Sequence, residues 1–291
     1  MTMNAARFPS TQPAQGELQY TDADFRRIAS ILMEDAGIAL PDSKAPLVYS
    51  RLAKRLRLLR IKSFKDYCSF VQTEEGIGER REMMTALTTN VTHFFREPHH
   101  FEELKTRVAP PLLESARRGG RIRIWSAGCS TGQEIYSIAM TLLEMEPELA
   151  KHNVKLLATD IDPKVLEKGR EAVYSNTVMA NVSEPLRSRY FKKIDGPIEP
   201  SWQVRTDVRA LVSFKELNLH RNFPMRGPFD IIFCRNVVIY FEKTMEEAVW
   251  TRFNSVLSPG GYLFVGHSER VSGPASASLI SSGVTAYKKQ A

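Results

Sequence analysis

The sequence contains few cysteines and lacks any long hydrophobic run. Its three cysteines, Cys68, Cys129 and Cys234, are odd in number and far apart. They therefore predict neither a disulfide framework nor a zinc-binding spacing, and they favour a reducing cytoplasm. No apolar stretch reaches the roughly 18 residues that cross a bilayer, so we expect no membrane insertion. Residues 1–20 also lack an apolar run, which predicts a disordered tail and not a signal peptide.

Acidic residues are scarce relative to basic ones. Lysine and arginine number 40 against 33 aspartates and glutamates, which gives a net charge of +7 and an isoelectric point near 9.3. This balance favours an acidic partner, which nucleic acid, anionic lipid or an acidic protein would each satisfy.

The basic excess is concentrated in residues 51–65, which contain no acidic residue. On a helix, several of these charges share a face beside a leucine stripe. A solvated surface is the ordinary meaning of such a run, but the absence of compensating acids favours recognition of an acidic surface. The candidate docking residues are Arg51, Lys54, Arg55, Arg57 and Arg60.

Residues 21–88 predict a small all-α domain. Thr21 and Asp24 have the spacing of a capping box, and Gly37 ends the first helix. Further helices are expected at about 47–60, after the cap Ser63, and at about 79–88. No strand pattern interrupts them, so the segment is typical of a four-helix module.

An α/β pattern begins at residue 121. A β-branched strand at about 122–125 leads through a small-residue loop into a helix at about 133–143. A second strand follows and ends in the carboxylate of Asp160. This order is that of a βαβ unit that binds a nucleotide, with the carboxylate on the ribose hydroxyls.

The loop of this unit lacks the G-x-G-x-x-G pattern. Gly128 and Gly132 are four residues apart, and Glu134 lies in the first turn of the following helix. Its negative charge would repel a diphosphate at that position but suits a cationic, phosphate-free cofactor such as S-adenosylmethionine. The pattern therefore predicts a methyltransferase.

Polar residues also follow the other predicted parallel strands, where open α/β sheets bind ligands. Besides 126–134 and Asp160, they are Asn218, which apolar Leu219 follows, and Arg235 with Asn236. Polar residues are common in loops, so each one alone is weak evidence, whereas the set is strong. Asp162 competes with Asp160 for the ribose, but it is equally suited to capping the helix that begins at Pro163, so we favour Asp160.

Four blocks of the sequence resemble the signature motifs of the chemotaxis receptor methyltransferases, the CheR family. They are Thr89-Asn-Val-Thr-His-Phe-Phe-Arg-Glu97, Trp125-Ser-Ala-Gly-Cys-Ser-Thr-Gly-Gln-Glu134, Ala158-Thr-Asp-Ile-Asp162 and Phe233-Cys-Arg-Asn-Val-Val-Ile-Tyr-Phe241. The resemblance implies a Rossmann-like S-adenosylmethionine-dependent methyltransferase sheet in residues 121–291. It also implies an inserted small β-subdomain at about 175–212, a preceding all-α domain that docks on the receptor, and a linker with helices at 89–120 that contribute to the cofactor site.

The same resemblance implies the activity. Methyl would pass from S-adenosyl-L-methionine to glutamate carboxylates on the cytoplasmic methylation helices of chemoreceptors, leaving S-adenosyl-L-homocysteine, by an enzyme recruited to membrane receptor arrays. A contact of the β-subdomain with a receptor C-terminal peptide is left open. Arg96 and Tyr240 would be catalytic, and the cofactor contacts would be Asn90, Thr92, Arg96, Glu134, Asp160, Asn218, Leu219, Arg235 and Asn236.

The chemistry of such a transfer is simple. A glutamate carboxylate with a pKa of about 4.3 is already an ionised nucleophile at neutral pH, so the reaction needs no base and no metal. Arg96 suits orientation of the incoming carboxylate, and Tyr240 suits a cation–π contact with the sulfonium, although a core aromatic is its ordinary alternative. The spacing of His93, His99 and His100 does not indicate a metal site.

Two other classes of protein compete with this interpretation. A nucleic-acid methyltransferase would use the high isoelectric point, but amine-directed enzymes carry an Asn/Asp-Pro-Pro-aromatic motif where this chain has Arg235 to Val238. Cys234 is not next to a proline either, as a pyrimidine-directed nucleophile typically is. We therefore expect no nucleic-acid partner. A non-catalytic cofactor-binding adaptor is the third class, and the presence of Arg96 and Tyr240 disfavours it.

Overall fold

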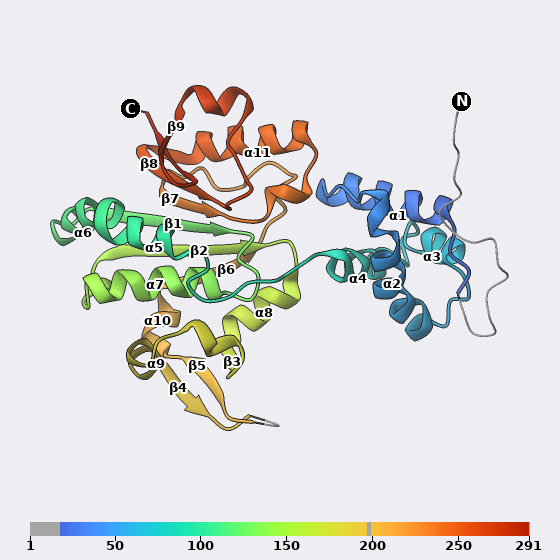
Figure 1. Ribbon diagram of the computed structural model, residues 1–291, viewed down its shortest axis with the longest axis horizontal. Coiled ribbons are helices and arrows are strands. Elements are labelled where there is room, and N and C mark those ends of the chain that lie inside the picture. Colours follow the sequence, from blue (N-terminus) through green and yellow to red (C-terminus); the bar gives the residue numbers. More distant parts are fainter. Residues whose placement is uncertain (1–17, 197–198, 291) are drawn as a thin grey trace. The chain divides into compact units, whose positions relative to one another are not determined.

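The computed structural model describes residues 18–196 and 199–290. The described chain separates into two compact units, which divide between Thr89 and Asn90 (Figure 1). The predicted tail lies outside the described residues for positions 1–17. Residues 18–20 belong to the first unit, because Gln19 bridges to Ser63 and the ring of Tyr20 lies 4.5 Å from that of Phe64. No helix in the described part of the chain is long and apolar enough to cross a membrane.

The first unit is all-α, as predicted. Its helices are α1 (Asp22–Ala36), η1 (Asp42–Lys44), α2 (Ala45–Leu59), α3 (Phe64–Phe70) and α4 (Ile77–Leu87). The capping box at Thr21 is present, Gly37 adopts the left-handed conformation that ends α1, and Ser63 caps α3. One apolar cluster fills the unit, with Ile28 and Leu52 fully buried at its centre.

The second unit is built on a seven-stranded, mostly parallel sheet of order β6-β2-β1-β7-β8-β10-β9. Its strands are β1 (Arg121–Ala127), β2 (Asn153–Asp160), β6 (Val212–Glu216), β7 (Phe229–Cys234), β8 (Leu257–Val265), β9 (Leu279–Gly283) and β10 (Ala286–Lys289). Strands β6, β2, β1, β7 and β8 pair in parallel, so their carboxyl ends lie at one edge of the sheet. Strand β10 runs antiparallel to β8.

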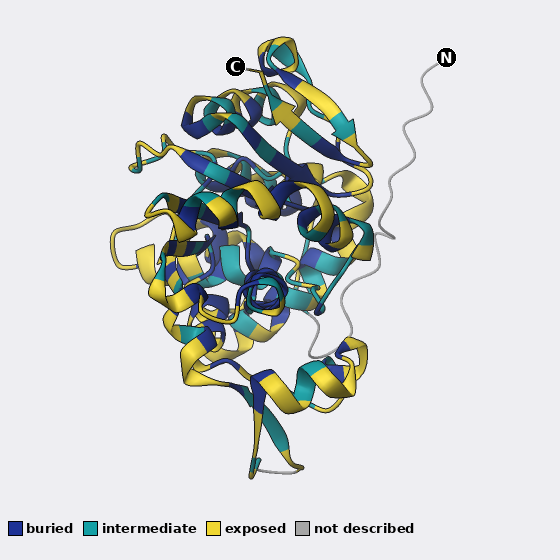
Figure 2. Cartoon of the chain, turned by 90° about the vertical axis from the view of Figure 1, so that its left-hand side faces the viewer, coloured by how far each residue is buried: buried dark blue, intermediate teal, exposed yellow. Residues whose placement is uncertain are grey.

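Helices cover the sheet through two apolar clusters, visible as buried segments in Figure 2. Neighbours on one strand enter different clusters: Ile124 and Phe233 join one, and Trp125 and Ile232 the other. Such alternation explains why the central strands are apolar on both faces. The helices are α5 (Pro98–Glu103), η2 (Leu104–Val108), α6 (Ala109–Arg117), α7 (Gln133–Met145), η3 (Leu149–Lys151), α8 (Pro163–Glu171), η5 (Val238–Tyr240), α11 (Lys243–Val256) and η6 (Gly273–Ala277).

Between α8 and β6 the chain forms the inserted small β-subdomain. Three antiparallel strands have the order β3-β5-β4, namely β3 (Val173–Ser175), β4 (Phe191–Ile194) and β5 (Ser201–Val204). Short helices accompany them: η4 (Val178–Asn181), α9 (Glu184–Tyr190) and α10 (Thr206–Ala210). The insert is expected at about 175–212, and in the structure its first strand begins at Val173 and its last helix ends at Ala210.

Residues 90–120 belong to the α/β unit and are more than a linker. Phe94, Phe101 and Leu104 are buried in the same cluster as the strand residue Ile124. The segment therefore forms part of the packed core beside the sheet, and its placement is fixed by apolar burial.

Candidate functional site

The loop after β1 bends sharply over the end of β2. The amides of Gly128 and Cys129 both donate to the carbonyl of Thr159, at 2.8 and 2.9 Å. Gly128 and Gly132 have positive φ angles of 79° and 94°, which favour glycine. A Cβ at Gly128 would lie 2.3 Å from a methyl group of Val237. Glycine is therefore required where this loop meets the loop after β7.

Asp160 stands at the end of β2 as a buried carboxylate, only 8% exposed. One oxygen accepts from the amide of Ser130 at 2.8 Å, and the other accepts from the amide of Asp162 at 3.1 Å. Burial raises the pKa of Asp160, and these backbone bonds oppose the rise. Asp160 thus fixes the loop after β1 as well as ending the strand, a position that fits a ribose ligand.

Of its two candidate roles, Asp162 takes that of capping α8, by accepting from the amide of Lys164 at 2.9 Å. Its second oxygen accepts from the side-chain amide of Asn90 at 3.1 Å. The carbonyl of Asn90 accepts from the Ser130 hydroxyl at 2.9 Å. Asn90 therefore ties the segment before α5 to both neighbouring loops, and its carboxamide is engaged by the protein.

A buried ionic cluster lies beside this loop. The Arg235 side chain, 2% exposed, has its guanidinium 3.3 Å from a carboxylate oxygen of Glu134 and 3.5 Å from one of Glu97. It also donates to the carbonyl of Arg96. Burial raises the pKa of Glu134, and Arg235 and a 2.7 Å bond from Ser126 oppose the rise.

The electrostatic balance at this edge of the sheet is negative. The guanidinium of Arg235 faces two carboxylates, those of Glu134 and Glu97. The buried carboxylate of Asp160 accepts hydrogen bonds only from backbone amides within the described residues. In a setting with little water, such a balance favours a cationic ligand and disfavours a diphosphate.

The segment that carries Arg96 has a strained backbone. Phe95 and Glu97, on either side of Arg96, adopt φ angles of 53° and 55°, which non-glycine residues rarely adopt. The Phe95 amide donates to Ser137 of α7 at 3.0 Å, and the Arg96 guanidinium donates to the Val91 carbonyl at 3.1 Å. Such strain, held by specific contacts, is typical of functional segments.

The loop after β7 carries Asn236 and Tyr240. Asn236 has a φ angle of 59°, and its side-chain oxygen is buried without a hydrogen-bond partner among the described residues. Tyr240 ends η5 and is half-buried, so it is not one of the buried core aromatics. The orphaned oxygen of Asn236 is an acceptor suited to a donor group of a ligand.

The loop after β6 reaches the same edge, because β6 pairs with β2 up to Asp160. The side-chain oxygen of Asn218 accepts from the amide of His220 at 2.9 Å. Leu219 is 6% exposed and packs in the core. Thr92 is half-buried in the segment before Arg96. The predicted cofactor residues thus all belong to one unit, and most of them lie at or just beyond the carboxyl ends of its parallel strands.

One cluster of possible metal ligands occurs in the described part of the chain. Ligand atoms of Glu97, His99 and His100 all lie within 4.8 Å of one another, a proximity that the sequence spacing did not indicate. Burial, followed by the charge of Arg235, lowers the pKa of His100 to about 3. Because Arg235 already supplies a cation beside Glu97, the cluster has a charge partner without a metal ion.

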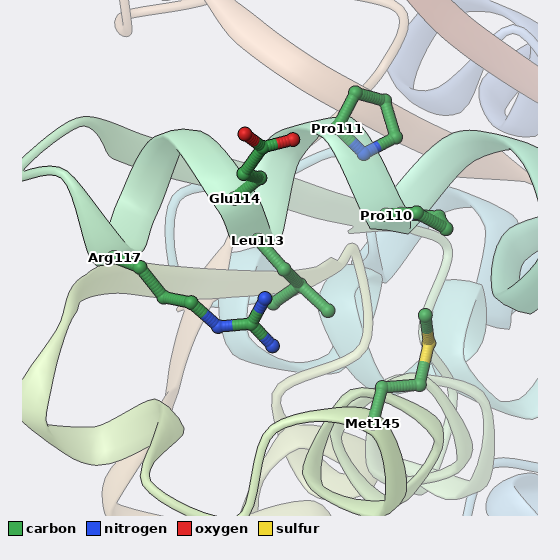
Figure 3. A pocket seen from close by; sticks show the side chains of 6 residues that line it. All are labelled: Pro110, Pro111, Leu113, Glu114, Arg117 and Met145. Atoms are coloured by element: carbon green, nitrogen blue, oxygen red, sulfur yellow. The ribbon is translucent and has the colours of Figure 1, made fainter.

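The surface hollow in Figure 3 lies elsewhere, on α6 and at the C-terminal end of α7. Its lining residues are Pro110, Pro111, Leu113, Glu114, Arg117 and Met145. Since α7 begins at the loop after β1, its far end is remote from the carboxyl edge of the sheet. The hollow contains no predicted site residue.

The five candidate docking residues, four on α2 and Arg60 at its C-terminal cap, divide into two groups in the helical unit. Arg51 donates to the carbonyls of Ala86 and Thr88, at 3.2 and 2.7 Å, and Arg55 pairs with Glu79 and Glu82 of α4. The compensating acids that residues 51–65 lack are therefore supplied by α4. The other three candidates are exposed and form no ion pair within the described residues; they are Lys54, Arg57 and Arg60.

Sequence reasoning missed several residues that organise the site. Glu97 closes the ionic cluster, Ser137 holds the Arg96 segment, and Glu269 accepts from the amides of the loop after β7. None lies directly after a strand in the way that Asp160 does. The sequence signal for Glu269 is its position three residues after Gly266, which directly follows β8. A carboxylate at this spacing can accept from the glycine amide, as Glu269 does.

This sheet, with its glycine loop and buried carboxylates at the carboxyl edge, defines an α/β protein of the class that binds a nucleoside-containing cofactor there. Family models specify it further: "CheR methyltransferase, SAM binding domain" matches residues 90–286, and "CheR methyltransferase, all-alpha domain" matches residues 23–88. The chain belongs to the CheR methyltransferase family.

Curated relatives agree with this assignment. A probable chemotaxis protein methyltransferase of Rhizobium etli is 47% identical over 258 residues, covering 89% of this chain and 96% of that protein. The chemotaxis protein methyltransferase of Escherichia coli is 43% identical, covering 88% and 87%. That of Salmonella typhimurium is 44% identical, covering 88% and 86%. The protein is therefore an S-adenosylmethionine-dependent methyltransferase of chemotaxis.

Proposed function

We propose that this enzyme transfers methyl from S-adenosylmethionine to glutamate side-chain carboxylates of chemoreceptors, giving methyl esters. The observation that carries the proposal is the placement of Arg96. Arg235 donates to the Arg96 carbonyl and also pairs with Glu134 beside the cofactor loop. The Arg96 side chain extends from the strained segment. The Arg96 backbone is thus held beside the proposed cofactor site, and its guanidinium, which donates to the Val91 carbonyl, supplies a cation on the same segment.

The residues present fit this cofactor. The excess of carboxylates around Arg235 suits a sulfonium and an amino group, and the orphaned oxygen of Asn236 can accept from a donor. The lack of a side chain at Gly128 makes room for Val237, so the loops after β1 and β7 lie against each other beside the proposed site. The residues proposed to hold it are Asn90, Thr92, Arg96, Glu134, Asp160, Asn218, Leu219, Arg235 and Asn236. When bound, S-adenosylmethionine supplies an electrophilic methyl group.

The residues of this chain have modest chemical tasks. A receptor glutamate is ionised at neutral pH, so no group here has to remove a proton. Arg96 would orient the incoming carboxylate by charge-assisted bonds. The half-buried ring of Tyr240 would border the reacting methyl and help to exclude water. This division of labour requires positioning above all, and neither a base nor a metal.

Receptor docking is proposed for the helical unit. The exposed charges Lys54 and Arg57 lie on α2 and Arg60 caps its C-terminal end, where they would attract the acidic methylation helices of a receptor. The small sheet β3-β5-β4 is the proposed candidate for a receptor C-terminal peptide, since its strands leave an edge for pairing. The enzyme would act in the cytoplasm at receptor arrays and would not use nucleic acid.

The nature of the methylated product tests this proposal. The protein is incubated with radiolabelled S-adenosylmethionine and a receptor signalling fragment, and in parallel with nucleic acid. We expect label on the receptor fragment that mild alkali releases as methanol, because methyl esters hydrolyse where N-methyl and C-methyl groups do not. Alkali-stable label on the receptor, or label on nucleic acid, would show that the acceptor is not a carboxylate.

A further inference from the structure

Glu269 lies beyond β8, is 4% exposed and binds the loop after β7 through its carboxylate. One oxygen accepts from the amides of Val237 and Val238, both at 2.8 Å, and from that of Ile239 at 3.4 Å. The other accepts from the amides of Asn236 at 2.9 Å and Gly266 at 2.6 Å. One side chain therefore satisfies five backbone donors.

No lysine or arginine pairs with this carboxylate among the described residues. Burial raises the pKa of Glu269, and the backbone amides oppose the rise. A buried carboxylate without a cationic partner is costly unless several donors are aimed at it. The amides of η5 and the turn before it supply these donors, so the carboxylate and the loop stabilise each other.

The surroundings leave this arrangement little freedom. A Cβ on Gly266 would lie 2.6 Å from the Asn236 side chain and 2.8 Å from the Glu269 carboxylate. Asn236 itself has a left-handed backbone, and the next residue, Val237, packs against Gly128 of the cofactor loop. Contacts thus run from Glu269 through the loop after β7 to the loop after β1.

We propose that Glu269 is a positioning residue, which holds Asn236 and Tyr240 in place for cofactor binding and methyl transfer by fixing the amides of residues 236–239. The inference rests on the proposed cofactor site, but not on the identity of the methyl acceptor. Glu269 acts through the loop, because its carboxylate is occupied by backbone donors.

Glu269→Gln tests the proposal. The substitution keeps the shape but replaces one acceptor oxygen by an NH2 group that faces backbone amides. We expect the affinity for S-adenosylhomocysteine, measured by calorimetry, to fall about tenfold or more. Hydrogen exchange of the amides in 236–239 should become faster, while exchange in the helical unit stays unchanged. Glu269→Asp keeps the charge but is shorter, so it should recover part of the affinity.

Glu146→Gln is the matched control. Glu146 is also buried and follows the C-terminal end of α7, where it accepts from Arg117. The Glu146→Gln substitution should lower stability without changing cofactor affinity or the hydrogen exchange of the amides in 236–239. Wild-type affinity and exchange in Glu269→Gln, or an equal loss of affinity in both variants, would overturn the positioning role. Failure of the wild type to bind S-adenosylhomocysteine would instead count against the proposed cofactor site.

Discussion

Replacing Asp160 with alanine is expected to weaken S-adenosylhomocysteine binding by roughly 2–4 kcal/mol, about 30- to 1,000-fold in Kd. Two losses combine in this variant. The ribose hydroxyls lose their proposed acceptor, and the Ser130 amide, which donates to Asp160 at 2.8 Å, loses the bond that shapes the cofactor loop. Calorimetry on the full chain measures the change, and methylation should fall with it.

Asp230→Ala is the control for this experiment. Asp230 is a carboxylate near the start of β7, where it accepts from the amide of Arg123 at 2.8 Å. The Asp230→Ala substitution therefore removes a comparable backbone contact at the opposite edge of the sheet. Cofactor affinity should stay near the wild-type value. An Asp160→Ala protein that is folded and binds with unchanged affinity would remove Asp160 from the site.

The sheet and its ligand edge could be predicted because the signals are local. Strand β7 coincides with the nearly continuous apolar run Phe229–Cys234, which is typical of a central parallel strand. A helix cap is one of two roles that the sequence indicates for Asp162, because Pro163 follows it, and the cap is present. The loops after β1, β2 and β7 then meet because parallel strands end at one edge.

Other features depend on contacts between distant segments. Glu269 binds amides some thirty residues earlier in the chain, and no periodicity marks such a bond. Strand β9 lies at the edge of the sheet, and its five residues, Leu279–Gly283, show neither an apolar run nor the regular alternation that would predict a strand. Residues 51–65 look uncompensated in sequence because Glu79 and Glu82 approach them only in the folded unit.

Among the basic residues of α2, Arg55 is the one whose replacement is expected to lower stability most. Arg55 contacts both oxygens of Glu79, a residue 7% exposed, and the Tyr67 hydroxyl donates to the same carboxylate at 2.7 Å. Burial, followed by the bond to Glu79, raises the pKa of Tyr67 well above its usual range. Arg55 therefore neutralises a carboxylate that has little access to water.

Arg55→Ala should destabilise the helical unit by roughly 2–4 kcal/mol, because Glu79 would remain buried without its cation. The lower end of that range reflects the partial exposure of Arg55, whose side chain is 22% exposed. Urea unfolding followed by circular dichroism measures the change. Arg57→Ala, on the same helix but exposed, should change the free energy of unfolding by less than about 0.5 kcal/mol. Equal stability of the two variants would contradict the pairing.

Receptor docking must accordingly be tested with the exposed charges alone. The double variant Lys54→Glu with Arg57→Glu should keep wild-type stability and S-adenosylhomocysteine affinity, since both side chains are exposed on α2. Its KM for a receptor fragment should rise about tenfold at low salt. The difference from the wild type should shrink as salt increases, because the screening length falls from about 10 Å at 0.1 M to about 3 Å at 1 M. An unchanged KM at low salt would mean that α2 presents a solvated face, whereas lost cofactor affinity in a folded protein would place α2 at the methyl-transfer site.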